Sequence, residues 1–362
     1  MRYQAIGLMS GSSMDGVDIT FATYTETGGK WQYELLIAET FPYSAQWEQD
    51  LANAVDLNAR NYQLLHTRYG RFLGDLINQF IAKYQLAHQV HVIASHGHTT
   101  FHEPNLYTTC QLGDGASIAA ITQLPVVSDL RAMDVAVKGQ GAPIVPMGER
   151  LLFAQYPMLL NLGGIANISI HQNENVLAFD IAAANQVFNH FANLMGFPFD
   201  DGGKLAASGQ VHEPLLQALD RLEFYSKAAP KSLANSFSKQ TVIPLMETFQ
   251  LSAVDQLATY IEHLSKIISS TVQTYADADL TQQPLLVTGG GALNTFLINK
   301  LKQTLETSAI QLVVPDDNTV LFKEALIMGL LGILRWREEV TALKTVTGAE
   351  RNTIGGALWL GA

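Results

Sequence analysis

The sequence has little of what would place it outside the cell or in a membrane. Its 362 residues include a single cysteine, Cys110, so no disulfide can form within the chain, which favours a reducing compartment. It has no run of about 18 apolar residues, the length that a membrane-spanning helix requires. The first residues lack a continuous apolar stretch, so we expect no signal peptide. These features predict a soluble, cytoplasmic protein.

Positive charge is also scarce. The chain has 22 Lys and Arg against 33 Asp and Glu, a formal net charge of -11, and no long basic run. Proteins that bind nucleic acids usually carry a basic face, so we expect no nucleic-acid partner. An anionic small molecule remains a candidate ligand, because backbone amides bind phosphate without lysine.

The remaining composition is that of a globular protein. Hydrophobic residues make up 48% of the chain and charged residues 15%, whereas disorder requires the opposite balance. A chain of this length is long for one hydrophobic core, so two domains are expected. Helical and strand patterns alternate along the sequence, which predicts an α/β fold.

One pattern of elements occurs twice. Residues 1–42 contain a strand, a glycine turn, a second strand, a polar turn and a third strand, and residues 157–182 repeat that order. We interpret the repeat as a duplication of an α/β domain with a mixed sheet flanked by helices. Two similar halves predict a cleft between them, a common place for ligands. The expected first domain covers 1–135, completed by 350–362, and the second covers 136–349.

Familiar nucleotide-binding motifs are missing. The sequence has no G-x-x-x-x-G-K-[ST], which excludes a P-loop, and no G-x-G-x-x-G after the first strand, which excludes a dinucleotide fingerprint. Other glycine-rich turns are present, namely "GSSMDG" at 11–16, "GGIAN" at 163–167 and "GGGALN" at 289–294.

These turns suit a phosphate-containing ligand. Glycine lets the backbone approach a ligand closely, and successive exposed N–H groups form an anion nest. The turns at 11–16 and 163–167 occupy equivalent places in the two halves, so we expect both to meet one polyphosphate. The turn at 289–294 follows a buried strand and opens a helix, whose N-terminus accepts parts of a nucleotide. A tight turn without a ligand is the alternative for each of them alone.

Asp15 lies inside the first of these turns. Phosphoryl transfer requires Mg²⁺, which usually takes one or two carboxylates and several waters. Asp15 is therefore a candidate magnesium ligand, directly or through water. The alternative is an Asx-type hydrogen bond that holds the turn.

Three histidines, His96, His98 and His102, lie in "ASHGHTTFHEP". The H-x-H spacing suggests a zinc hydrolase that uses His96 and His98. Neither H-E-x-x-H nor an aspartate before Asp114 accompanies them, so a hydrogen bond to a polar ligand or a structural role is the favoured interpretation.

Arg131 follows a buried strand and suits a ligand carboxylate, which arginine binds with two hydrogen bonds. Its alternative role is a salt bridge to Asp129 or Asp134. Glu324 lies in the first turn of a predicted helix, where a carboxylate is favoured even without a ligand.

Asp180 ends the third strand of the second half, just before a helical segment. A carboxylate at the end of a strand, facing the expected cleft, suits a general base. The alternative is an N-cap for a helix that starts near Ala182.

Taken together and in this order, the motifs resemble those of the anhydro-N-acetylmuramic acid kinase family, in the sugar kinase, Hsp70 and actin superfamily. The resemblance covers nearly the whole chain, from "IGLMSGSSMDGVDI" to "TGAERNTIGG". The motifs between them are "ASHGHTTFH", "QLGDGASIAAIT", "VVSDLRAMDVAVKGQGAPIVP", "LNLGGIANISI", "TGGGALNTFL" and "KEALIMGLL". The resemblance implies two duplicated actin-like, RNase H-like domains that close on ATP.

It also implies a reaction. The family opens the 1,6-anhydro ring of 1,6-anhydro-N-acetylmuramic acid with water and phosphorylates O6 at the expense of ATP, with Mg²⁺, in cell-wall recycling. Asp180 matches the catalytic base, and the sugar-pocket positions match His96, Arg131 and Glu324. The positions that match ATP contacts are Gly11, Ser12, Ser13, Asp15, Gly16, Gly163, Gly164, Asn167, Gly289, Gly290, Gly291 and Asn294. The family further implies a homodimer.

The chain departs from the family pattern at several positions. Ser12 replaces a threonine, His98 replaces a glutamine, and Ile181–Ala183 replaces Thr-Gly-Pro after the base. The motif Lys-Ser-Thr-Gly-Arg is reduced to "KSLAN" at 231–235. The changes fall more on the sugar side than on the ATP turns. A sugar kinase for another amino sugar therefore stays an alternative, as do a nucleotide-binding protein without catalysis and the zinc hydrolase.

Overall fold

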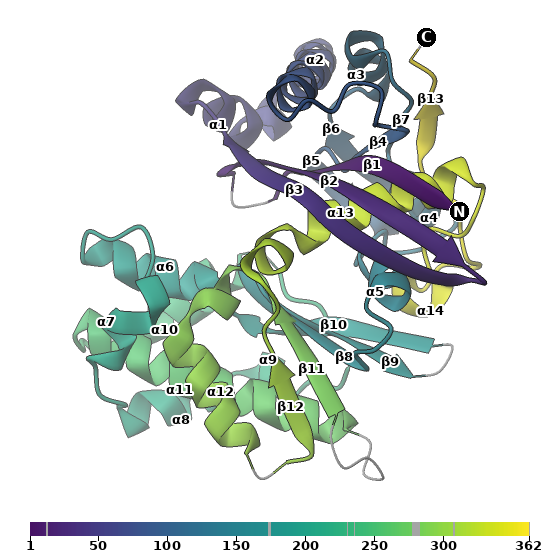
Figure 1. The fold of residues 1–362 in the computed structure, drawn as a ribbon. Coiled ribbons are helices and arrows are strands. Elements are labelled where there is room, and N and C mark those ends of the chain that lie inside the picture. The colour runs from purple at the N-terminus through teal and green to yellow at the C-terminus, as the bar shows by residue number, and fades with distance from the viewer. Residues whose placement is uncertain are drawn as a thin grey trace. The chain divides into compact units, whose positions relative to one another are not determined.

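The computed structural model of the chain describes residues 1–11, 14–172, 175–229, 231–234, 236–276, 283–306 and 308–361 (Figure 1). These residues form two compact units. Unit 1 consists of Met1–Ala154 and Phe322–Ala362, and unit 2 consists of Gln155–Leu321. The boundaries differ from those expected, because 136–154 and 322–349 both belong to unit 1.

Two helices explain why unit 1 is larger than the first domain expected from the sequence. Helix α5 (Pro146–Leu152) packs on the edge of the first sheet. Helix α13 (Asp317–Trp336), which belongs to unit 1 from Phe322 on, packs closely against Gly7 of the same sheet through Ala325. Tyr24 donates a hydrogen bond to a backbone carbonyl of α13, with an O···O distance of 2.6 Å. A buried ion pair between Lys323 of α13 and Glu149 of α5, at 2.5 Å, joins the two helices. Sequence periodicity did not reveal these long-range contacts.

Unit 1 is built on a six-stranded sheet in the order β13-β7-β4-β1-β2-β3. Its strands are β1 (Arg2–Met9), β2 (Gly16–Thr27), β3 (Lys30–Pro42), β4 (Val92–Ser95), β7 (Val126–Ser128) and β13 (Ala357–Trp359). Strands β1, β2 and β3 form an antiparallel meander, whereas β1, β4 and β7 run parallel. A separate hairpin of β5 (His98–Glu103) and β6 (Thr108–Leu112) was not expected from the sequence.

Helices cover this sheet and bury its apolar side chains. Besides α5 and α13 they are α1 (Ala45–Ala52), α2 (Ala59–Lys83), α3 (Gly115–Thr122), α4 (Ala132–Ala136) and α14 (Lys344–Thr347), with 3-10 turns η1 (Ala54–Asp56) and η2 (Pro104–Leu106). The side chain of Asn58 caps the N-terminus of α2. The buried face of α2 recurs at helical spacing and includes Leu73, Leu76, Ile77 and Phe80. These residues form the core of unit 1 with strands β1 and β2.

Unit 2 repeats the arrangement with a five-stranded sheet in the order β10-β9-β8-β11-β12. Its strands are β8 (Met158–Leu162), β9 (Ile165–Gln172), β10 (Asn175–Ala183), β11 (Gln283–Thr288) and β12 (Ile310–Val313). Strands β8, β9 and β10 are antiparallel, and β8, β11 and β12 are parallel. The meander and the two parallel strands follow the same plan as β1, β2, β3, β4 and β7. The predicted duplication of an α/β unit is therefore confirmed.

The helices of unit 2 enclose a second core. They are α6 (Asn185–Leu194), α7 (Lys204–Ala207), α8 (Glu213–Asp220), α9 (Glu223–Ser226), α10 (Ile243–Glu247), α11 (Ala253–Tyr275) and α12 (Thr295–Leu305), with turns η3 (Asp201–Gly203), η4 (Ser238–Val242) and η5 (Gly290–Leu293). Helix α11 contributes Leu257, Ile261 and Leu264, which pack with Leu160 and Ile168 of the sheet. The cores of both units thus lie between a sheet and its helices.

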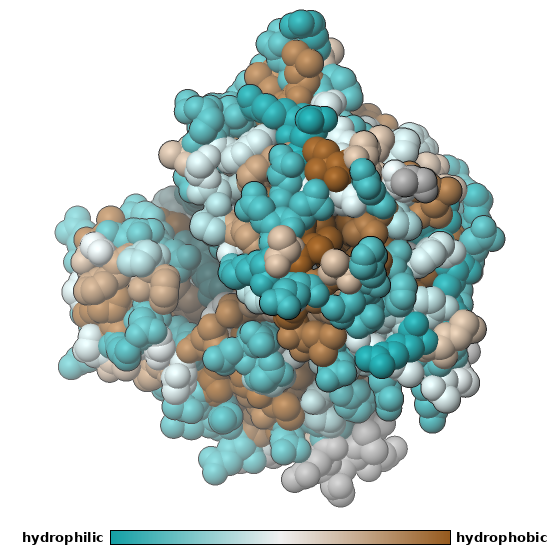
Figure 2. Space-filling view, turned by 45° about the horizontal axis from the view of Figure 1, so that its top comes forward, coloured by the Kyte–Doolittle hydropathy of each residue, from teal (hydrophilic) through white to brown (hydrophobic). Residues whose placement is uncertain are grey.

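The surface carries mostly hydrophilic residues on the face shown in Figure 2, and hydrophobic residues lie between them in separate patches. Within the described ranges, no helix combines the length and apolar character needed to cross a membrane.

Candidate functional site

A row of polar residues crosses the sheet of unit 2 where β8 and β9 meet. Asp180 of β10 pairs with Asn167 of β9, which pairs with Asn161 of β8, and Asn161 pairs with Thr288 of β11. Directly paired residues present their side chains on the same face of a sheet. Two predicted site residues, Asp180 and Asn167, are thus brought together with two residues that the sequence analysis missed.

The carboxylate of Asp180 is held by the segment 231–234. Its Oδ2 accepts hydrogen bonds from the Leu233 backbone N at 2.8 Å and from Ser232 Oγ at 3.3 Å. Burial raises the pKa of Asp180, and these two hydrogen bonds act in the opposite direction. The N-cap alternative is wrong, because α6 begins at Asn185 and its cap position is Ala184. The shortened "KSLAN" motif therefore still contacts the candidate base, although its Asn235 lies outside the described residues.

The second glycine loop, Gly163 and Gly164, joins β8 to β9 in unit 2. Its carbonyls accept hydrogen bonds from the backbone N of Asn185 at 3.0 Å and of Ala184 at 2.9 Å. The start of α6 thereby fixes the loop without side chains. This leaves a short turn of two glycines at the polar end of the sheet.

The third glycine segment, Gly289–Gly291, follows β11 and approaches the second loop. Gly289 has a φ of 80°, and a Cβ on it would lie 2.6 Å from Asn161 Oδ1 and 2.8 Å from the Leu162 carbonyl carbon. The side chain of Asn185 also reaches this region, donating to Leu162 O at 3.0 Å. Only glycine fits at position 289 for both reasons. Asn161 could have been predicted as a site residue from one sequence feature, a polar side chain within an otherwise apolar strand.

The predicted contact residue Asn294 has a structural task. Its Oδ1 accepts a hydrogen bond from Leu297 N at 3.0 Å and caps α12, and the residue is 7% exposed. The expectation that this turn opens a helix is confirmed. A nucleotide contact by Asn294 stays a prediction.

The first glycine loop, residues 11–16, joins β1 to β2 in unit 1, and its Ser12 and Ser13 lie outside the described residues. Met14 N donates to Gly11 O at 3.4 Å and Met14 has a φ of 55°. Gly16 packs against the backbone carbonyl of Phe41, where a Cβ would clash. The side chain of Asp15 is exposed, and its carbonyl accepts a hydrogen bond from Tyr43 N.

Two of the predicted sugar-pocket residues contact each other in unit 1. Arg131 Nε donates to His96 Nε2 at 2.8 Å, and Arg131 Nη1 donates to Gly141 O at 2.5 Å. Because His96 Nε2 accepts, its Nδ1 carries the proton and donates to Gly97 O at 2.9 Å. Burial, together with the nearby guanidinium, lowers the pKa of His96 to about 3, so the ring is neutral.

The salt bridges proposed as the alternative role of Arg131 do not form. Asp134 accepts hydrogen bonds from Gly141 N and Thr347 Oγ1, each at 2.8 Å, and Asp129 accepts one from Ser128 Oγ at 2.6 Å. Burial lowers the pKa of Arg131 to about 10, which leaves it charged at neutral pH. Its guanidinium is therefore a cation without a carboxylate directly bonded to it in the described part of the chain.

Glu324 and Asp18 add negative charge to the same unit. Burial raises the pKa of Glu324, while the charges of Lys323 and Arg131 lower it. Asp18 of β2 accepts a hydrogen bond from Thr40 Oγ1 at 2.6 Å, and burial raises its pKa to about 6, with Asp15 and Glu324 adding to the rise. Asp18 is not recognisable as a site residue from the sequence, because strand alternation indicates which face of the sheet it lies on but not which residues surround it.

The three histidines do not form a zinc site. Both ring nitrogens of His96 are engaged, His98 Nδ1 lies 3.0 Å from Ser10 Oγ, and His102 Nδ1 lies 3.0 Å from Thr109 Oγ1. Across the described ranges, no group of three or more His, Cys, Asp or Glu side chains is placed to hold a metal ion. The zinc-hydrolase alternative is thus not favoured.

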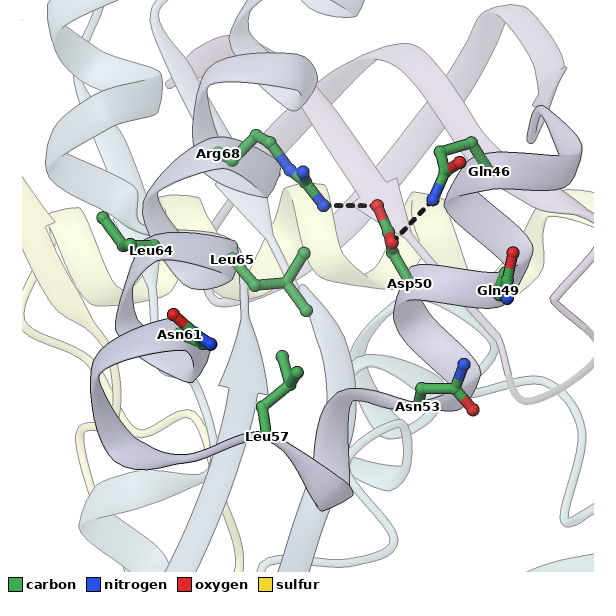
Figure 3. A pocket seen from close by; sticks show the side chains of 9 residues that line it. All are labelled: Gln46, Gln49, Asp50, Asn53, Leu57, Asn61, Leu64, Leu65 and Arg68. Atoms are coloured by element: carbon green, nitrogen blue, oxygen red, sulfur yellow. Dashed lines mark hydrogen bonds and ion pairs between the residues drawn. The ribbon is translucent and has the colours of Figure 1, made fainter.

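A surface pocket of about 430 Å³ lies between α1 and α2 in unit 1 (Figure 3). Carboxamides, three leucines and the ion pair of Asp50 with Arg68 line it. No predicted site residue lines this pocket, so it is separate from the polar residues described above.

The chain is similar to one family along its whole length. The model of the family described as anhydro-N-acetylmuramic acid kinase matches residues 2–361. A curated anhydro-N-acetylmuramic acid kinase from Variovorax paradoxus is 32% identical, and the alignment covers 98% of each chain. Another from Burkholderia ambifaria is 34% identical, covering 98% of this chain and 95% of that protein.

Among solved structures, the activator of 2-hydroxyisocaproyl-CoA dehydratase from Clostridium difficile with bound ADPNP has a TM-score of 0.47 and 14% sequence identity. That match covers 92% of this chain and 96% of the other.

Proposed function

The chain belongs to the anhydro-N-acetylmuramic acid kinase family, and we propose that Asp180 is the catalytic base of its reaction. The enzyme uses ATP to open 1,6-anhydro-N-acetylmuramic acid with water and to phosphorylate O6. The products are N-acetylmuramic acid 6-phosphate and ADP, and the reaction belongs to peptidoglycan recycling. The family match over the whole chain carries this function.

Asp180 suits the base because one of its oxygens is fixed. Among described residues, both hydrogen bonds to its side chain end on Oδ2, which orients the carboxylate toward a bound water through Oδ1. Asp180 takes a proton from the water as the water oxygen bonds to the anomeric carbon. The C1–O6 bond breaks, and O6 attacks the γ-phosphorus of ATP. The bond to the β-phosphate oxygen then breaks, and ADP leaves.

The glycine loops are proposed to hold the nucleotide. The first loop, with Gly11, Ser12, Ser13 and Gly16, and the second, with Gly163 and Gly164, would donate backbone N–H groups to phosphate oxygens. Gly289–Gly291 and Asn294 would contact the adenosine. The close packing at Gly289 supports a fixed position for this segment, because its backbone lies directly against Asn161 and Leu162 at the end of β8.

The sugar is proposed to contact His96, Arg131 and Glu324. N-acetylmuramic acid carries a lactyl carboxylate, which a guanidinium recognises well. Arg131 is charged and is held in place by His96 and Gly141, so it is prepared for such an anion. Neutral His96 orients the arginine without competing for the carboxylate.

Magnesium is the metal that the family implies, and the carboxylates at the first loop fit it. Asp15 and Asp18 offer hard oxygen donors, and the influence of Asp15 on the pKa of Asp18 indicates that the two charges interact. Asp15, directly or through water, would hold the ion with the phosphates. When bound, Mg²⁺ neutralises charge on the phosphate oxygens.

We also place the reaction in the cytoplasm and predict a homodimer. The single cysteine and the use of ATP support the compartment. The dimer follows from the family pattern, and light scattering coupled to gel filtration would give the mass that tests it.

The test of the reaction is turnover of 1,6-anhydro-N-acetylmuramic acid with Mg-ATP in water labelled with heavy oxygen. We expect ADP and a sugar phosphate in equal amounts, with the label in the sugar and none in the phosphate. Label in the phosphate would show ATP hydrolysis instead. Turnover of another amino sugar but not of this one would establish the alternative substrate.

A further inference from the structure

Tyr43 contacts both ends of the first glycine loop. It follows the last residue of β3, and its hydroxyl lies 2.7 Å from Ser10 Oγ, just before the loop. Its backbone N donates to Asp15 O at 3.3 Å, near the end of the loop. Tyr43 is 7% exposed and Ser10 is 5% exposed, so water does not compete for the hydroxyl pair. A single residue thus ties the loop to the edge of the meander.

The Ser10 hydroxyl belongs to a longer buried network. Ser10 Oγ also lies 3.0 Å from His98 Nδ1, and the Tyr43 hydroxyl bonds to the hydroxyl of Tyr69. Each hydroxyl donates one proton and accepts another, so the hydrogen bonds from His98 to Tyr69 can all form with the protons pointing in either direction along the chain. The tautomer of His98 determines that direction. Burial raises the pKa of both tyrosines and lowers that of His98, which keeps the network neutral.

The loop conformation requires such support. Met14 has a φ of 55°, a left-handed conformation that is unfavourable for a residue with a Cβ. A loop that binds phosphate through its backbone is effective when its N–H groups are already oriented, since ordering them on binding costs affinity. The hydrogen bonds of Tyr43 to Ser10 and Asp15 hold the two ends of the loop in place before the ligand arrives.

We propose that Tyr43 is a positioning residue, which orders the first glycine loop for ATP through its hydrogen bond to Ser10. The inference rests on the proposed role of this loop in phosphate binding. It does not involve contact between Tyr43 and the nucleotide.

Kinetics of Tyr43→Phe provide the first test, because this variant removes the hydroxyl and keeps the ring. We expect the KM for ATP to rise roughly 3- to 10-fold, the effect of one neutral hydrogen bond, with kcat and the KM for the sugar little changed. Tyr69→Phe is the matched control, since it removes a buried phenol of the same network and leaves the Ser10 bond in place. An equal rise in both variants, or no rise in Tyr43→Phe, would overturn the proposal.

Hydrogen–deuterium exchange separates this inference from the proposed function. We expect Mg-ATP to slow exchange of the peptide spanning 10–16 in the wild type, and Tyr43→Phe without ATP to exchange faster there than Tyr69→Phe. Protection by ATP with unchanged exchange in Tyr43→Phe would refute the positioning role alone. No protection of the wild-type loop by ATP would refute the phosphate role of the loop, and the positioning role with it.

Discussion

The first and second glycine loops occupy the same place in two sheets of the same plan, yet they are supported differently. In unit 1 the loop is long, and the side chain and backbone of Tyr43 tie its ends. In unit 2 the loop is two glycines, and Ala184 and Asn185 at the start of α6 bind its carbonyls. Duplication therefore preserved the position of the loop, whereas its support is specific to each unit.

The carboxylates near the two loops differ in the same way. Asp18 lies on the middle strand of its meander and bonds to Thr40, while Asp180 lies on the edge strand and is held by the segment 231–234. An edge strand leaves room for a second segment to orient the acid. The comparison shows that two sheets of the same plan carry these carboxylates on different strands of the meander, with different partners.

Asp180→Asn tests this difference with the largest expected effect. The amide cannot accept a proton from water, so kcat should fall by about 10²- to 10⁴-fold. The dissociation constant for Mg-ATP, measured by calorimetry, should change little. Near-normal turnover would contradict the assignment of the base.

Asp18→Asn is the matched substitution in unit 1. We expect saturating Mg²⁺ to restore most of kcat, with a higher Mg²⁺ concentration needed for half-maximal rate, because the variant loses a carboxylate beside Asp15. A loss of kcat as large as that of Asp180→Asn, at saturating Mg²⁺, would erase the difference between the two carboxylates.

Gly289→Ala tests the close packing around the loops of unit 2. The positive φ and the contacts with Asn161 and Leu162 should lower the free energy of unfolding by about 2–4 kcal/mol. Gly29→Ala in unit 1 is the control, since Gly29 also has a positive φ but no atom lies within 4 Å of its Cβ position; it should cost only about 1 kcal/mol. Urea denaturation measures both, and equal losses would count against close packing.

Ser232→Ala sharpens the role of the segment that holds Asp180. The Ser232 hydrogen bond lowers the pKa of Asp180, so its removal raises that pKa further above the ordinary value. The base acts in its ionised form, and activity is lost as pH falls through its pKa. The acid limb of the kcat profile should therefore move to higher pH. An unchanged limb would mean that Asp180 does not control it.

His98→Gln should have the smallest effect. A carboxamide still hydrogen-bonds to Ser10 Oγ and keeps the network of the first loop neutral, so the KM for ATP should stay within about twofold of wild type. His98→Leu removes the partner and should give the larger KM. Equal KM values for the two variants would show that this hydrogen bond does not matter to the loop.

Much of the fold could be predicted from local patterns. The two meanders, the glycine turns and the helices follow from strand alternation, glycine placement and helical spacing, which are short-range properties. The unit boundaries could not, because α5 and α13 join unit 1 through contacts between distant segments such as Lys323 and Glu149. Hydrophobic spacing along one helix does not specify its partner.

The candidate site likewise contains residues that local sequence patterns predict and residues that only tertiary contacts reveal. Asp180 and the glycine turns are recognisable from their place at the ends of strands. Asn161 emerges only when strand register sets it beside Asn167. Tyr43 is invisible in the sequence, since its link to Ser10 depends on the pairing of β2 with β3 and on burial. Side-chain partners that come from distant segments therefore could not be predicted from the sequence.

The central claim is that both glycine loops bind the phosphates of ATP while Asp180 acts as the catalytic base. Hydrogen–deuterium exchange of Asp180→Asn with Mg-ATP and the anhydro sugar tests this claim most directly. This variant should hold ATP without turning it over. The account predicts slower exchange in both 10–16 and 162–167 when ATP is added. Protection of only one loop, or of neither, would contradict it.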